Sequence, residues 1–113
     1  MSASTEPERT FTKNASLFAA LGDETRLSLL VQLGGGNLCS ITQLAEGRPQ
    51  TRQAIRKHLH VLEAVDLVKG VRRGRENLFQ IEPKVVESAA QSLVAISQQW
   101  DDALSRLKSF VEE

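Results

Sequence analysis

The chain has 113 residues, of which 41% are apolar and 25% are charged, and a formal net charge of zero, which suits one globular domain with a modest core. It has no apolar run of about eighteen residues, and residues 1–12 lack the apolar core of a signal peptide, so we expect a cytoplasmic protein without a membrane-spanning helix. The single cysteine, Cys39, excludes an internal disulfide and a zinc site made of several thiolates.

Positive charge is concentrated in one stretch of the chain. The 14 Lys and Arg residues balance the 14 Asp and Glu residues overall, but residues 48–75 contain eight basic and only two acidic side chains. This segment therefore carries a charge of +6, and the rest of the chain carries −6. Such a segment indicates either a polyanionic partner or a solvated basic surface, and charge alone does not decide between them.

The first third of the chain is predicted to form a flexible arm followed by two helices. Residues 1–12 are expected to be the arm, which leaves 13–113 as one domain. An amphipathic helix over 12–21, ending at Gly22, is predicted from three apolar residues at helical spacing, Leu17, Phe18 and Leu21. Asp23 suits the N-cap of a second helix, which glycines 34–36 terminate. The residues of this helix expected to face the core are Leu27, Leu30 and Val31.

A helix-turn-helix is predicted between residues 40 and 65. Ser40 suits the N-cap of a two-turn helix over 41–46. Gly47 and Pro49 interrupt it, and Thr51 suits the N-cap of a further helix that runs to about Val65. Two helices joined by a four-residue turn that contains Gly are typical of this motif.

The second helix of the motif has an apolar face and a polar face. On a helical wheel, Ile55, Leu59 and Leu62 fall within about 40° of one another and define the core face. An α-helix fits the major groove of DNA, where Arg, Gln and Thr side chains can read base edges. A solvated polar face is the alternative interpretation. We expect base contacts from Thr51, Arg52, Gln53 and Arg56, and phosphate contacts from Lys57 and His60.

The two histidines are expected to have different surroundings. His58 lies at the edge of the core face, which predicts a half-buried residue bonded to the backbone or to a neighbouring helix. His60 points away from the core. Their spacing of two residues makes the side chains diverge on a helix, so the pair cannot chelate one metal ion.

A β-hairpin is predicted after this motif. Residues 67–72 and 77–81 are rich in β-prone side chains, and Gly74 in the connection can close a hairpin. The hairpin loop carries three arginines, Arg72, Arg73 and Arg75. The predicted fold class is mainly α with a small β-hairpin. Helix, turn and arginine-rich hairpin together favour binding of double-stranded DNA.

The last element is predicted to be one long helix. From Pro83 to Val111 no Gly or internal Pro interrupts the chain, and a helix of this length measures about 40 Å. An apolar stripe with steps of three and four residues runs along it: Val86, Ala89, Leu93, Ile96, Trp100, Ala103, Leu107 and Phe110. A small core cannot cover this stripe, so we expect a second copy of the chain to do so. The alternative is a helix that bends back over its own domain.

The sequence gives little support to an enzyme or to a single-stranded RNA-binding protein. The sequence has no paired carboxylates, no nucleophile beside a base and no glycine-rich phosphate loop after a strand, so we expect no enzyme and no cofactor. The absence of Tyr and the scarcity of other aromatic residues argue against a single-stranded RNA-binding protein. A dimeric protein-interaction module, such as an antitoxin-like partner, remains the alternative. It would use the long apolar helix but leave the basic segment without a role.

Three segments resemble the ArsR/SmtB family of bacterial winged-helix repressors. Residues 17–27, LFAALGDETRL, are similar to the opening signature of that family, and residues 53–63, QAIRKHLHVLE, to its recognition helix. Residues 68–83, with Arg73-Gly74-Arg75-Glu76, resemble its wing. The resemblance covers residues 15–110, with all elements in order.

The resemblance implies a homodimeric, sequence-specific repressor with a winged helix-turn-helix and a long C-terminal dimerisation helix. Its recognition helices would enter successive major grooves of an inverted-repeat operator, with half-sites about 34 Å apart. The wing at 72–75 would reach the flanking minor groove or the backbone. The dimer interface would lie on the first and last helices, with contacts from Leu17, Phe18, Leu93, Ile96, Trp100, Leu107 and Phe110.

The sequence departs from the metal-sensing members of that family. Their thiolate sites use two cysteines one residue apart at the start of the first motif helix, where this chain has only Cys39. Their other frequent site uses Asp and His on the last helix, but residues 84–113 contain no His, and acids such as Glu87, Asp101 and Asp102 alone suit zinc poorly. We therefore expect no metal site and an inert, buried Cys39. The sequence does not identify a small-molecule effector.

Overall fold

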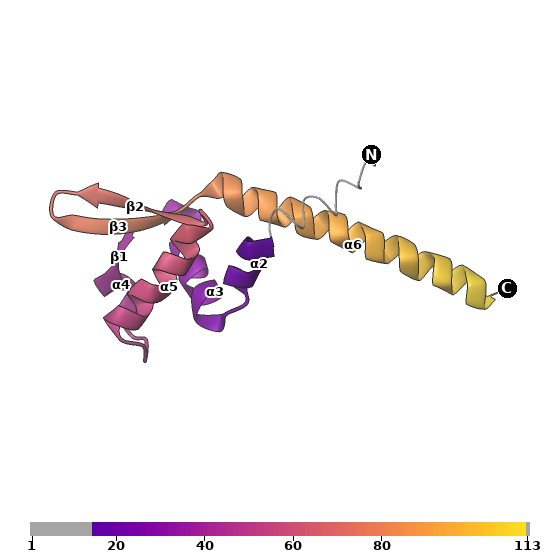
Figure 1. Ribbon diagram of the computed structural model, residues 1–113, viewed down its shortest axis with the longest axis horizontal. Helices are drawn as coiled ribbons and strands as arrows, with labels where there is room; N and C mark the ends of the chain where they lie inside the picture. The colour runs from indigo at the N-terminus through magenta and orange to yellow at the C-terminus, as the bar shows by residue number, and fades with distance from the viewer. Residues whose placement is uncertain (1–14, 113) are drawn as a thin grey trace.

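The computed structural model describes residues 15–112. In chain order the elements are α2 (Ala15–Leu21), α3 (Glu24–Leu33), the 3-10 helix η1 (Gly34–Gly36), β1 (Cys39–Ser40), α4 (Ile41–Ala45), α5 (Arg52–Ala64), β2 (Val68–Arg73), β3 (Glu76–Ile81) and α6 (Pro83–Glu112). Figure 1 shows a body of short helices with the β2–β3 hairpin at one end and α6 projecting from it in the other direction. The expected arm, residues 1–12, lies outside the described residues.

Side chains cap three helices at the predicted residues. The carboxylate of Asp23 accepts a bond from the backbone N–H of Arg26 at the start of α3, at 3.0 Å. Ser40 and Gln43 form a capping box at α4, with reciprocal bonds of 3.1 and 2.8 Å. The hydroxyl of Thr51 accepts from the N–H of Ala54 at 3.0 Å and fixes the start of α5. Each cap satisfies a backbone N–H that a helix start leaves unpaired.

The predicted core face of α5 is confirmed, because the side chains of Ile55, Leu59 and Leu62 are fully buried. The prediction for α3 was wrong for Leu27 and Val31, while Leu30 does pack against the core. Leu29 and Leu33 are its buried residues and Leu30 is half-buried, whereas Leu27 is 48% and Val31 82% exposed. Apolar residues surround α3 on most sides, so periodicity could not show which side faces the core.

The hairpin is confirmed with its boundaries shifted by one residue at the turn. Arg73 pairs with Glu76, and Gly74 takes a φ of 60° at the first central position of the two-residue turn, where an L side chain would be strained. The structure adds a third strand that was not predicted. β1 pairs with β3, which places β3 in the centre of the sheet and ties the start of the helix-turn-helix to the wing. Two residues are too few to show strand alternation.

α6 is the predicted long helix, with 30 residues and a length of about 45 Å. Near its start Ala89 is 5% exposed and Ser92 is buried. Further along, three large apolar side chains are open to solvent, at 64% for Trp100, 59% for Leu107 and 80% for Phe110. No helix within residues 15–112 is long and apolar enough to cross a membrane.

The junction between α5 and β2 contains a strained residue. Asp66 has a φ of 61°, and two bonds close the helix end around it: the N–H of Leu67 donates to the carbonyl of Leu62, and the N–H of Asp66 donates to that of Glu63, both at 3.0 Å. This pattern is a Schellman motif, whose left-handed position is usually Gly. Asp66 therefore holds a conformation that costs an L residue free energy.

Candidate nucleic-acid interface

The predicted DNA-contacting residues lie on two elements and are all exposed. Thr51 and the first three turns of α5 present Arg52, Gln53, Arg56, Lys57 and His60 opposite the buried face of the helix. The wing presents Arg72, Arg73 and Arg75 at and next to its turn. Because Ile55, Leu59 and Leu62 are buried in the core, the rotation of α5 is fixed, and the residues on its other side point outward.

A shared hollow connects α5 to the wing. Arg56 of α5 lines it together with Glu76 and Asn77 of β3 and with residues 40–43 at the start of α4. A second, neighbouring hollow brings Arg52 of α5 beside Thr42 and Gln43 of α4. The recognition helix, the wing strand and the start of α4 therefore border one continuous region of the surface. Thr42 and Gln43 are exposed and belong to this region, although neither was predicted to contact DNA.

Six of the eight basic residues in segment 48–75 point outward without a described acidic partner. Lys69 pairs with Glu82 at 3.4 Å, and the half-buried Arg48 is directed onto α3 and α4. Among the ion pairs formed within residues 15–112, none involves the other six. These six define the outward basic surface: Arg52, Arg56, Lys57, Arg72, Arg73 and Arg75.

His58 joins α5 to the start of α3, as predicted for a structural histidine. Its Nδ1 atom lies 3.2 Å from a guanidinium nitrogen of Arg26 and 3.8 Å from a carboxylate oxygen of Asp23. The Arg26 side chain also donates through Nε to the carbonyl of Ala20, which links α2 to this junction. The bond from the backbone N–H of Arg26 is the main cause that lowers the pKa of Asp23 below its usual value, and His58 and the Arg26 charge lower it further.

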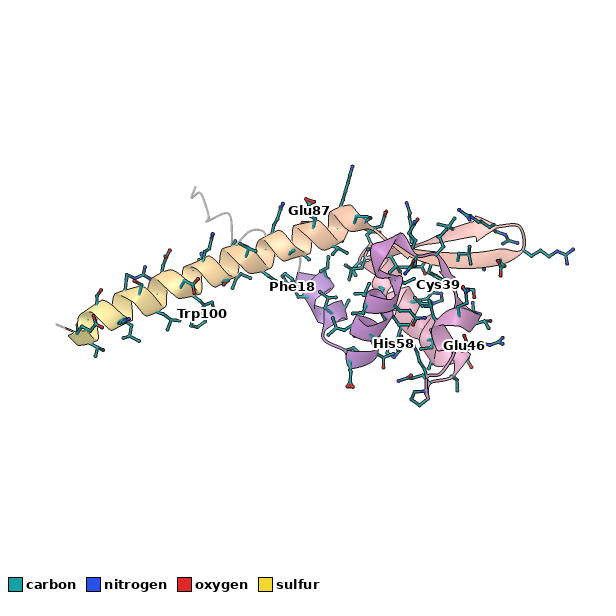
Figure 2. The ribbon with its side chains drawn as sticks, turned by 180° about the vertical axis from the view of Figure 1, so that it is seen from behind. Phe18, Cys39, Glu46, His58, Glu87 and Trp100 are labelled. Carbon is teal, nitrogen blue, oxygen red and sulfur yellow. The ribbon has the colours of Figure 1, made fainter. Side chains whose placement is uncertain are left out.

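The described residues include no group of three or more His, Cys, Asp or Glu side chains that could hold a metal ion. Cys39 is half-buried and packs against the core, which is less burial than predicted. Figure 2 shows Cys39 and His58 in the helical body, with Glu87 near the start of α6 and Trp100 far along it.

The residues predicted for a dimer interface differ in exposure. Four on α6 are exposed by half or more, Leu93, Trp100, Leu107 and Phe110, and Ile96 is half-buried. Phe18 is half-buried as well. Leu17 is only 5% exposed within one chain, so the protomer core already covers it.

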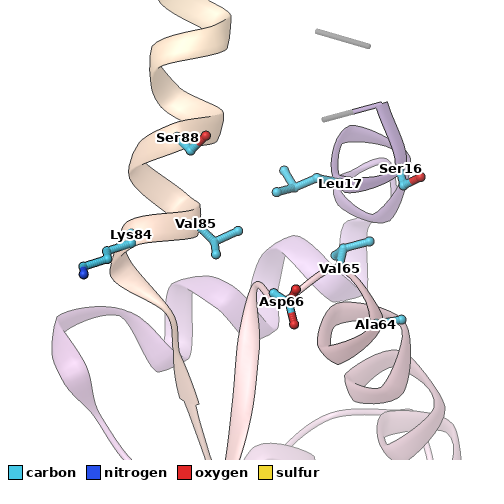
Figure 3. A pocket seen from close by; sticks show the side chains of 8 residues that line it. All are labelled: Ser16, Leu17, Ala64, Val65, Asp66, Lys84, Val85 and Ser88. Carbon is cyan, nitrogen blue, oxygen red and sulfur yellow. The ribbon is translucent and has the colours of Figure 1, made fainter. Parts of the chain in front are cut away.

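A further hollow lies at the other end of α5. Figure 3 shows it between α2, the junction after α5 and the first turns of α6, with Leu17, Val65 and Val85 on its apolar sides and Asp66 and Lys84 at its edge. The 13 residues of α5 place this end about 18 Å from the end that carries Arg52. This hollow is thus separate from the outward basic surface.

Comparison with known proteins agrees with this arrangement. Residues 21–71 match the family model of a helix-turn-helix domain. The HTH-type transcriptional regulator YuzN of Bacillus subtilis is 38% identical over 76 residues, which are 60% of this chain and 83% of YuzN. A homodimeric winged helix-turn-helix DNA-binding domain from Mycobacterium bovis matches with a TM-score of 0.64 at 18% identity, covering 90% of this chain and 95% of that one, which shows likeness of fold alone.

Another structural match extends over almost all of both proteins. An ArsR-like transcriptional regulator from Rhodococcus sp. RHA1 is 40% identical, covers 91% of this chain and 94% of its own, and has a TM-score of 0.78. The resemblance drawn from the recognition helix, the wing and the opening signature is thereby confirmed. The chain belongs to the ArsR-like family of helix-turn-helix transcriptional regulators.

Proposed function

We propose that the protein is a homodimeric repressor that binds an inverted-repeat operator in double-stranded DNA, acting in the cytoplasm where a bacterial chromosome lies. The observation that carries the proposal is the outward basic surface of α5 and the wing. Six cations on two adjoining elements, without described acidic partners, suit a phosphate backbone.

Base reading is assigned to the first turns of α5. Arg56 can donate two bonds to guanine, Gln53 can bracket adenine, and the methyl group of Thr51 can contact thymine. Because the N-terminal residues of a recognition helix approach the base edges most closely, Arg52 joins this group. Lys57, His60 and the wing arginines are assigned to phosphates, where charge matters more than base identity.

The exposed apolar stripe of α6 supports a homodimer. Trp100, Leu107 and Phe110 are each more than half exposed, and a second α6 related by two-fold symmetry would cover them. The Mycobacterium bovis domain of the same fold is itself homodimeric. Such a dimer presents two copies of α5, which matches an inverted repeat with half-sites about 34 Å apart. Repression is assigned because the resemblance to the ArsR/SmtB family of repressors implies it.

The test is to recover the fragments that the purified protein retains from genomic DNA at physiological salt, with and without added zinc. We expect a small set of fragments that share an inverted repeat, with retention unchanged by zinc. A dimer has twelve residues of the outward basic surface. If each neutralised one phosphate, the slope of log K against log salt would be about −11, so we expect a slope no steeper than this.

Other outcomes would contradict the proposal in distinguishable ways. Uniform retention of all fragments would indicate binding without sequence preference. No retention, together with recovery of a stoichiometric protein partner, would favour a protein-interaction module. Release of the DNA by zinc would show a metal site that the described residues do not form.

A further inference from the structure

A polar stripe on α3 receives the turn of the helix-turn-helix. Thr25, Ser28 and Gln32 are spaced by three and four residues, so they lie along one side of α3 next to its buried face. Each of the three bonds to the segment around the turn. Gln50 Nε2 donates to Thr25 Oγ1 at 3.0 Å, and Gln32 Nε2 donates to the carbonyl of Gln43 at 3.4 Å. The remaining bonds of the stripe come from Arg48.

The guanidinium of Arg48 uses all three of its nitrogens at this junction. Its Nε donates to the carbonyl of Leu44 at 2.7 Å, one Nη to Ser28 Oγ at 2.9 Å and the other to Gln32 Oε1 at 2.8 Å. The Leu44 carbonyl lies in the last turn of α4. Carbonyl groups in the last turn of a helix have no N–H donor within the helix, so Arg48 supplies the missing hydrogen bond. Because the guanidinium is planar and rigid, the three bonds fix the end of α4 against α3, a geometry that an ammonium group could not reproduce.

This junction directly precedes the recognition helix. Arg48 and Gln50 are anchored to α3 on both sides of Pro49, whose ring restricts its own φ. The next residue, Thr51, is the N-cap of α5. The backbone that leads into the first turn of α5 is therefore held at two points immediately before the residues assigned to base reading.

We propose that Arg48 is a positioning residue for sequence recognition: it docks the turn on the Thr25–Ser28–Gln32 stripe, places the first turn of α5 for base contact, and does not itself contact DNA. This inference rests on the proposed function. It separates Arg48 from the other basic residues of segment 48–75, whose side chains face outward.

The test compares Arg48→Met with Arg73→Met, each of which removes one positive charge but keeps an unbranched apolar stem. For Arg48→Met we expect about tenfold weaker operator binding, equivalent to the loss of one base contact, with an unchanged salt slope and unchanged affinity for an unrelated duplex. For Arg73→Met we expect weaker binding of both duplexes and a salt slope shallower by about one for each protomer. Binding is measured at a temperature at which circular dichroism shows that every variant is fully folded. A loss of stability alone then does not change the ratio of operator affinity to affinity for the unrelated duplex.

A second variant covers the case in which Arg48→Met fails to fold. Gln32→Met removes one acceptor of Arg48 from α3, well outside the outward basic surface, and we expect it to lower operator affinity without changing the salt slope. The double variant should lose less affinity than the sum of the two single losses, because the bond between Arg48 and Gln32 is removed in both single variants. Additive losses would overturn the proposal.

Hydrogen exchange provides a measurement that needs no DNA. We expect Gln32→Met and Arg48→Met to accelerate exchange of the backbone amides of residue 48 and of residues 50–54, since Pro49 has no amide hydrogen, while amides of the wing remain unchanged. Unchanged exchange at 48–54, or a salt slope that becomes shallower for Arg48→Met, would overturn the positioning role. If the wild-type protein bound no operator while both variants still exchanged faster in this segment, the structural role of the junction would stand and the proposed function would be refuted.

Discussion

Replacing Leu107 with Glu is expected to dissociate the proposed dimer while leaving the protomer folded. The Leu107 side chain is 59% exposed in one chain, so the protomer core depends little on it. Burial of a whole leucine stabilises by about 1.5–3 kcal/mol, so covering the exposed 59% contributes about 1–2 kcal/mol. A two-fold interface contains the residue twice, which raises the loss to about 2–4 kcal/mol, or about 30- to 700-fold in the dimer dissociation constant. Desolvation of two carboxylates adds to this loss.

Sedimentation equilibrium measures the effect directly, with circular dichroism to monitor folding. The matched control is Gln98→Glu, because nine residues at 100° each place Gln98 on the opposite side of α6 from Leu107. Both variants add a carboxylate to the same helix, but only Leu107→Glu should shift the protein from dimer to monomer. A dimer constant equal to that of the wild type in Leu107→Glu would refute the assignment of the α6 stripe to self-association.

Three further predictions concern DNA recognition and local stability. Arg56→Ala should weaken operator binding by about 1–3 kcal/mol and relax preference at one base pair, whereas Arg73→Ala should weaken all duplexes by similar factors, as fluorescence anisotropy titrations on several sequences would show. Asp66→Gly should stabilise by about 0.5–1 kcal/mol in urea unfolding because Gly adopts the φ of 61° without strain, and a loss of stability would contradict this view of the Schellman motif. The pKa of Asp23 in the folded protein lies below its unfolded value of about 3.8. The ionised carboxylate therefore stabilises the fold above that pH, and this stabilisation is lost as pH falls through the folded pKa. Asp23→Asn keeps the cap but cannot ionise, so it should flatten this part of the curve of stability against pH in acid unfolding.

Helix ends and the hairpin could be predicted because they depend on local chemistry. A side chain that caps a helix acts on a backbone N–H two or three residues away, so Asp23, Ser40 and Thr51 carry their structural signal within a few residues of sequence. The hairpin is equally local, since Gly74 supplies the positive φ that its turn requires. The core face of α5 was also predictable, because Ile55, Leu59 and Leu62 share one side and most residues on the opposite side are polar.

The buried side of α3 and the role of Arg48 could not be predicted in this way. The contacts that decide them join residues far apart in sequence. Leu29 and Leu33 are buried because α3 packs on α5, while Val31, an equally apolar residue, remains 82% exposed. Arg48 lies in the basic segment by sequence, but its partners on α3 are 16 and 20 residues away. The sequence pattern does show a polar Thr25–Ser28–Gln32 stripe at helical spacing, and this stripe is the signal that could have identified the docking side.

Affinity and specificity in this protein should therefore respond differently to salt. The outward basic surface attracts phosphates through charges that ions screen within about 8 Å at physiological ionic strength, and the −6 of the remaining chain is repelled by DNA under the same conditions. Raising salt weakens both effects, so overall affinity and the preference for approaching DNA with α5 and the wing decline together. The bonds of Arg48 to Leu44, Ser28 and Gln32 end on neutral oxygens inside the protein, and added ions do not compete for them as they compete for phosphates. Under the proposed positioning role of Arg48, these bonds place the turn of α5 to which base reading is assigned, so discrimination between operator and unrelated DNA should persist at salt concentrations that have already removed most of the affinity.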